Sequence, residues 1–126
     1  MPVKAKYQDV LDLGEKLGVE NGNVRVEDGV LKIKGTTKTQ YEKNLLWDEI
    51  KRIGGEQPND LMANIIVADD SVYHRHTVVK GETLGGIAKH YYKNAMKYKE
   101  IFEANRGILD NPDLIKVGQV LDIPNL

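Results

Sequence analysis

The sequence has 126 residues, 40% hydrophobic and 29% charged, which is the balance of a globular protein with one ordinary domain or two small ones. Its formal net charge of −1 excludes the basic surplus of a nucleic-acid-binding protein, and without cysteine it can form neither a disulfide nor a thiolate metal site. No apolar run is long enough to cross a membrane, so we expect no membrane partner. Residues 1–14 lack the apolar core and small-residue cleavage site of a secretory signal, which indicates a cytoplasmic protein.

The first predicted element is a short amphipathic helix over residues 7–18. Val10, Leu13 and Leu17 fall on one helical face, and the charged residues between them point elsewhere. Gly18 is expected to end the helix.

A β-hairpin is predicted next. Apolar and charged residues alternate on both sides of Asp28-Gly29, a pair that suits the positive φ angles of a two-residue turn. We expect one face of the hairpin to join the core and the other to face solvent. The apolar positions are Val24, Val26, Leu31 and Ile33.

A longer helix and a third strand complete this half of the chain. Apolar residues recur at helical spacing from Tyr41 to Ile53, over roughly four turns, and Gly54-Gly55 follows them. Residues 62–68 form a hydrophobic run that predicts a strand. The order helix, strand, strand, helix, strand predicts a small α+β domain over residues 1–70, with two helices on one face of the sheet.

This N-terminal half resembles a BON domain. The resemblance rests on the αββαβ order, on the central Asp28-Gly29 turn and on the strand exit Ile33-Lys34-Gly35. The polar junction Asp69-Asp70-Ser71 follows, and we expect residues 71–75 to be a short linker that allows little relative movement of two domains.

The last third of the chain predicts a strand, two helices and a strand. The β-branched run 77–79 favours the first strand, and Thr83 stands at the N-cap of a helix with one apolar stripe. A second helix is expected to end near Gly107, and the final strand covers residues 120–123. The stripe of the first helix consists of Leu84, Ile87, Ala88 and Tyr91, and that of the second of Tyr98, Ile101 and Phe102.

Residues 76–126 closely resemble a LysM domain. The family pattern is matched in order by Gly81-Glu82-Thr83-Leu84, Ile87-Ala88, Ala104-Asn105 and the run 118–124, GQVLDIP. Lys116-Val117 replaces a frequent Tyr-Pro, which removes an aromatic residue from the expected ligand loop. The resemblance implies a βααβ fold and a protein that binds its ligand without cutting it.

A BON-like domain followed directly by a LysM domain resembles the BON-LysM family of bacterial potassium-binding proteins. The resemblance covers almost the whole chain. It implies a cytoplasmic, non-enzymatic protein, expected to be a monomer, that binds potassium ion and changes the packing between its two domains. It implies no organic cofactor.

The LysM resemblance also implies a groove for N-acetylglucosamine glycans such as peptidoglycan. If the two strands pair, the turn after the first strand and the loop 108–115 lie side by side and offer backbone amides, carbonyls and apolar walls to an N-acetyl group. The same residues can instead serve only to cap a helix and turn the chain. The groove residues are Gly81, Glu82, Thr83, Leu84, Ile108, Leu109, Asp113, Leu114 and Ile115.

Potassium binding leaves no spaced motif, because several oxygens, often backbone carbonyls, hold this large cation. The acidic candidates are Asp69 and Asp70 at the junction, and Glu27 and Asp28 at the hairpin tip. Solvated surface charge is the alternative role of each.

The sequence also offers a possible zinc site and a second alternative function. His74 and His76 alternate along an extended segment and His90 lies on a helix, but two imidazoles on one face fall short of the three or four ligands of a zinc site. LysM units also occur in phage-tail-like structures, so an assembly adaptor is a second alternative function.

Overall fold

The computed structural model describes residues 2–126 and divides into two compact units, Met1–Asp70 and Ser71–Leu126. Helices and strands occur in both, so the α+β class is confirmed. None of the helices in the described part of the chain combines the length and the apolar character needed to cross a membrane.

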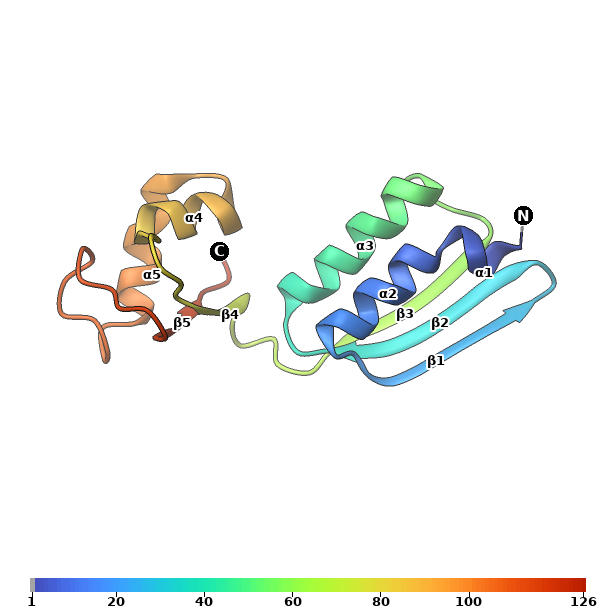
Figure 1. The fold of residues 1–126 in the computed structure, drawn as a ribbon, viewed down its shortest axis with the longest axis horizontal. Helices are drawn as coiled ribbons and strands as arrows, with labels where there is room; N and C mark the ends of the chain where they lie inside the picture. The colour runs from blue at the N-terminus through green and yellow to red at the C-terminus, as the bar shows by residue number, and fades with distance from the viewer. Residues whose placement is uncertain (1) are drawn as a thin grey trace. The chain divides into compact units, whose positions relative to one another are not determined.

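Unit 1 is a three-stranded sheet with helices on one face (Figure 1). The strand order is β1-β2-β3; β2 runs antiparallel to β1 and parallel to β3. This is the predicted αββαβ order with one additional turn of helix at the start. The elements are α1 (Val3–Lys6), α2 (Gln8–Leu17), β1 (Glu20–Glu27), β2 (Val30–Thr37), α3 (Gln40–Gly54) and β3 (Leu61–Val67).

Local signals fix the ends of these elements. Asp28 and Gly29 have φ angles of 53° and 77°, so the two-residue turn has the predicted conformation. Helix α3 begins at Thr39, whose hydroxyl accepts from the Glu42 amide at 3.3 Å as the N-cap, and the Glu42 carboxylate reaches back to accept from the Lys38 amide at 3.0 Å.

The core of unit 1 lies between the helices and the sheet. Tyr7 is fully buried in it, and its hydroxyl donates to Asp60 Oδ1 at 2.5 Å. Burial and the nearby Asp60 carboxylate raise the pKa of Tyr7 to about 12. A Cβ on Gly54 would lie 2.1 Å from the Tyr7 hydroxyl, so this position at the end of α3 requires glycine. The other buried hydrophobic residues are Val10, Leu31, Leu46, Ile50, Leu61 and Ile65.

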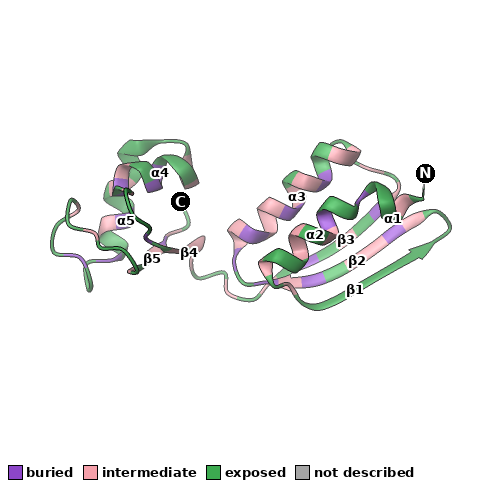
Figure 2. Ribbon diagram, in the orientation of Figure 1, coloured by how far each residue is buried: buried purple, intermediate pink, exposed green. Residues whose placement is uncertain are grey.

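Strand β1 differs from the prediction because all eight of its residues are exposed (Figure 2). Val24 and Val26 pair with Ile33 and Leu31 and therefore share the helix-facing side of the sheet, yet they are 45% and 48% exposed. The expectation that they enter the core is wrong. β1 is an edge strand, and the core residues on β2 and β3 take up the contacts with the helices.

Unit 2 has the βααβ order predicted for a LysM domain. β4 pairs antiparallel with β5, and two helices lie between them in the sequence. The expected linker 71–75 includes the first two residues of β4, and the Tyr73 amide already donates to the Ile123 carbonyl at 2.8 Å. The elements are β4 (His74–Thr77), α4 (Leu84–Tyr92), the 3-10 helix η1 (Ala95–Lys97), α5 (Tyr98–Ala104) and β5 (Val120–Ile123).

Asn105, which is 5% exposed, joins α5 to β5 inside this unit. Its amide nitrogen donates to the Ile101 and Asp122 carbonyls at 2.7 and 2.8 Å, and its amide oxygen accepts from the Asp122 N–H at 2.8 Å. The asparagine of the Ala104-Asn105 motif therefore has a structural role, because its side chain joins the end of α5 to β5. The buried hydrophobic residues around it are Val78, Leu84, Ile87, Ala88, Ile101, Leu109, Leu121 and Ile123.

Candidate functional site

The turn that precedes α4 is the first part of the candidate site. Gly81 has a φ angle of 89°, which favours glycine, and the Thr83 hydroxyl accepts from the Gly86 amide at 3.0 Å as the N-cap of α4. Leu84 is 2% exposed and belongs to the core. The Gly-Glu-Thr-Leu motif therefore combines a tight turn at Gly81, a helix cap at Thr83 and a core anchor at Leu84. Glu82 acts through its carboxylate, which accepts hydrogen bonds.

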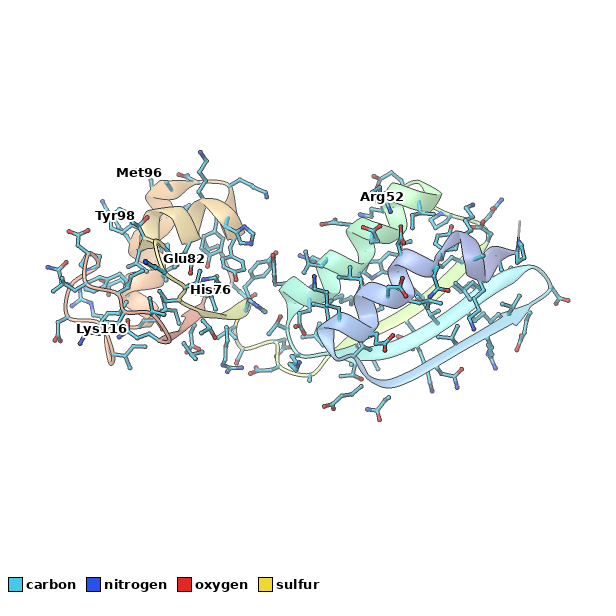
Figure 3. The ribbon with its side chains drawn as sticks, viewed as in Figure 1. Arg52, His76, Glu82, Met96, Tyr98 and Lys116 are labelled. Carbon is cyan, nitrogen blue, oxygen red and sulfur yellow. The ribbon has the colours of Figure 1, made fainter. Side chains whose placement is uncertain are left out.

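Glu82 is held by a hydrogen-bond network that links β4, the turn and α4. His76 Nε2 lies 2.8 and 3.0 Å from the two Glu82 oxygens, and its Nδ1 lies 2.7 Å from the Tyr91 hydroxyl. The Val79 amide donates to Glu82 Oε1 at 2.7 Å. Figure 3 shows His76 and Glu82 facing one another across the turn. His76 of β4, the Val79 amide and Tyr91 of α4 together hold the turn in its conformation.

The surroundings of Glu82 keep it ionised. Partial burial raises the pKa of Glu82, but the hydrogen bonds from the Val79 amide and His76, together with the electrostatic effect of the nearby His76 and His90 side chains, outweigh burial and hold the pKa below its usual value. The turn thus holds a carboxylate whose oxygens have hydrogen-bond partners within unit 2.

The three histidines gather around one tyrosine. The rings of His74, His76 and His90 have centroids 5.7, 5.5 and 4.8 Å from that of Tyr91. Both nitrogens of His76 already have protein partners, and the described residues contain no group of three or more side chains placed to hold a metal ion. The alternating histidines therefore serve ring packing and the Glu82 network.

The loop 108–115 forms the second part of the candidate site. Leu109 is 2% exposed, and Ile115 packs on the same core cluster as Leu84, so turn and loop rest on a common core. Ile108 and Leu114 are 53% and 65% exposed, and Asp113 is also exposed. The loop therefore has one buried anchor, Leu109, one partly buried anchor, Ile115, and two apolar side chains open to a ligand.

The Gly-Gln motif at 118–119 closes this loop against β4. The Val78 amide donates to the Gln119 carbonyl and the Gly118 amide donates to the Val78 carbonyl, both at 2.9 Å. The Gln119 side chain accepts from the Lys116 amide at 2.7 Å. Val117, at the site of the family's frequent proline, is 68% exposed. The hydrogen bonds that close the loop are therefore present with Lys116-Val117 in place of Tyr-Pro, and the replacement affects the exposed surface of the loop.

The four acidic potassium candidates fall at opposite ends of the unit 1 sheet. Glu27 and Asp28 lie at the hairpin tip, whereas Asp69 follows β3, whose last residue pairs with Thr37 at the far end of β2. Eight extended residues span roughly 25 Å, so the four carboxylates do not share one ion. The Glu27 carboxylate is already bonded to Lys32 at 2.9 Å and lies 3.2 Å from Arg25, and both cations hold its pKa below the usual value.

Comparison with known proteins agrees with this architecture. The LysM domain family matches residues 76–124. The potassium binding protein Kbp of Escherichia coli O6:H1 is 36% identical over 103 residues, which are 81% of this chain and 68% of that protein. The chain belongs to the Kbp family. Because 103 residues exceed either unit alone, the likeness to Kbp includes parts of both.

A second relative covers less of the chain. An uncharacterised protein of Deinococcus radiodurans is 49% identical over 55 residues, which are 44% of this chain and 20% of that protein. The Kbp relationship and the LysM domain together support a binding protein.

The sequence does not predict that His76 forms hydrogen bonds with Glu82 and Tyr91. His76 precedes Glu82 by six residues, and this spacing is no recognised pattern. The two side chains meet because the strand reverses into the turn, and Tyr91 reaches the other ring nitrogen from α4.

Proposed function

We propose that this protein is a non-enzymatic potassium-binding protein. The observation that carries the proposal is the 103-residue likeness to Kbp, which exceeds the length of either unit and so is not explained by a LysM domain alone. A protein that shares only the LysM domain would match over residues 76–124 and stop there.

Oxygen atoms of the chain would supply the potassium site. Backbone carbonyls suit this cation, and a nearby carboxylate would balance its charge. Asp69 and Asp70, which follow β3 beside the junction of the two units, are the carboxylates that we propose for this role. Following the family resemblance, we expect binding to alter the packing of the two units.

The test is a titration of the full chain with potassium chloride and, separately, sodium chloride at constant ionic strength, followed by amide chemical shifts and by the radius of gyration. We expect saturable shifts with potassium that Asp69→Asn and Asp70→Asn weaken and that Asp28→Asn leaves unchanged. Equal responses to the two ions, or none to either, would refute the proposal.

A second candidate function is recognition of N-acetylglucosamine glycans, favoured by the LysM match and by the geometry of unit 2. The turn and the loop share one core, and Ile108 and Leu114 leave apolar surface beside backbone groups. An N-acetyl group needs one donor, one acceptor and an apolar contact for its methyl group, and such elements are what a small-ligand groove offers.

Retention of the full chain on purified peptidoglycan sacculi tests this second function. We expect Leu114→Ala to reduce retention severalfold, because that side chain is 65% exposed in the loop. Met96→Ala is the matched control, since Met96 is 66% exposed but lies on η1. Absence of retention for the unaltered chain, or equal losses in both variants, would exclude glycan binding through this loop.

A further inference from the structure

The helices of unit 1 leave one face of its sheet open (Figure 1). Two rows of side chains cross that face, and all but Met62 are polar. Register places Asn23, Lys34 and Asn64 in one row across the three strands, and Arg25, Lys32 and Met62 in the next. Side chains directly opposite each other on neighbouring strands have Cβ atoms about 5 Å apart. The six side chains therefore form one continuous patch, which we call the open-face patch.

The open-face patch has more cations than carboxylates. Two of its three cations are bonded to Glu27, which lies 3.2 Å from Arg25 Nε and 2.9 Å from Lys32 Nζ, and the exposed Glu20 pairs with Thr36, two positions beyond Lys34 on β2. Among residues 2–126, no carboxylate is within salt-bridge distance of Lys34. Arg25 and Lys32 are direct cross-strand partners, and like charges in that arrangement destabilise a sheet. Glu27 bridges this pair, so Lys34 is the cation of the patch that an added anion would pair with.

The amide side chains of the patch are also available to a ligand. Asn23 and Asn64 flank Lys34 on either side, and neither side chain makes a hydrogen bond to another described residue. Asparagine is depleted in strands, so strand formation does not explain why two asparagines lie beside an unpaired lysine. Met62, which is 62% exposed, adds an apolar wall.

A hollow of about 320 Å³ lies over these side chains. Its volume is at the lower end of small-ligand pockets, and no aromatic residue lines it for base stacking. A small ligand fits this surface better than a nucleic-acid strand does.

We infer that the open-face patch binds a small molecule through a phosphate group. Arg25 and Lys34 supply charge-assisted hydrogen bonds, and a phosphate dianion has both the charge and the number of acceptor oxygens to engage them together with the two amides. The site lies wholly within unit 1, on the sheet face away from the helices, and it is independent of the potassium and glycan functions proposed above.

The test is a titration of the ¹⁵N-labelled full chain with sodium pyrophosphate at fixed ionic strength and fixed potassium concentration. We expect saturable amide shifts confined to residues 23–25, 32–34 and 62–64. Lys34→Gln is expected to weaken binding roughly tenfold, the effect of losing one charge-assisted hydrogen bond. Lys16→Gln removes the same charge from an exposed position on α2 and should change the affinity by less than about twofold.

Three outcomes would overturn the inference. Pyrophosphate that causes no saturable shift, or that loses equal affinity in both lysine variants, would show only general attraction to positive charge. Citrate binding as tightly as pyrophosphate would remove the phosphate preference. Binding of a ten-residue oligothymidine without binding of pyrophosphate would assign the patch to nucleic acid instead. Because both lysines are exposed, the variants are expected to remain folded, which their amide spectra verify.

Discussion

Removing the Glu82 carboxylate tests whether the network around His76 holds the candidate turn. In Glu82→Ala, the Val79 amide and His76 Nε2 lose the acceptor that lies 2.7 to 3.0 Å away. Hydrogen bonds to a charged group contribute about 1.5–3 kcal/mol each when buried, but the side chains of Glu82 and His76 are 26% and 18% exposed. Solvent competition reduces the sum, and we expect unit 2 to lose about 2 kcal/mol of unfolding free energy at pH 7.

The loss should depend on pH in a defined direction. The pKa of Glu82 in the folded protein lies below its usual value of 4.5, so its ionised form stabilises the fold fully above pH 4.5. That contribution is lost as the pH falls from 4.5 through the lowered pKa. The difference between Glu82→Ala and the unaltered protein should therefore be largest at neutral pH and smaller at pH 3.

Urea unfolding followed by amide peak volumes in residues 74–124 measures this effect. Glu103→Ala is the matched control, because Glu103 is an exposed carboxylate of the same unit whose salt bridge to Arg106 spans only three residues. Such a surface pair contributes at most about 0.5 kcal/mol. A loss in Glu82→Ala no larger than in the control, or one that is unchanged between pH 7 and pH 3, would refute the reasoning.

Two other substitutions test the packing within the units. Gly54→Ala should destabilise unit 1 by about 2–3 kcal/mol, because its Cβ would lie 2.1 Å from the Tyr7 hydroxyl. Gly85→Ala in α4 should stabilise unit 2 by about 0.5–1 kcal/mol, because its Cβ would lie 4.0 Å from the nearest atom, the Ala95 carbonyl oxygen. Urea midpoints that shift equally in the two variants would contradict this contrast. Asn105→Ala should cost unit 2 about 2–4 kcal/mol, since it leaves the buried end of α5 and the Asp122 amide without partners, and a loss under 0.5 kcal/mol by the same amide measurement would show that water replaces them.

Much of the fold could be predicted because its signals are local. Positive φ at Asp28-Gly29 and the cap at Thr83 involve only residues within one turn of the chain, and both lie where the sequence placed them. The first strand of the LysM unit is an instructive difference. The β-branched run 77–79 predicts the strand, but only Thr77 of that run belongs to it; Val78 bonds to Gln119 and Gly118 beyond its end. The strand itself begins at His74, where β-propensity gives no signal and the partner strand decides.

The candidate sites were less predictable, because they depend on which distant residues meet. From the sequence, Glu82 is predicted as a groove residue and His76 is considered as a zinc ligand. Only the folded chain brings the two side chains into contact. The sequence also grouped Asp28 with Asp69 as potassium candidates, although the sheet places them at opposite ends.

The sequence by itself determined the family, the order of helices and strands and the turns, because each is written in residues that are close neighbours along the chain. Tertiary structure decided which side chains are buried and which polar groups share a partner. Val24 and Val26 show the reason: their alternation is correct, but exposure depends on whether a helix packs on the strand. No residue of β1 is buried, whereas β3, the other edge strand, places Leu61 and Ile65 in the core. The same geometry leaves the opposite face of the sheet open, with Lys34 unpaired on it.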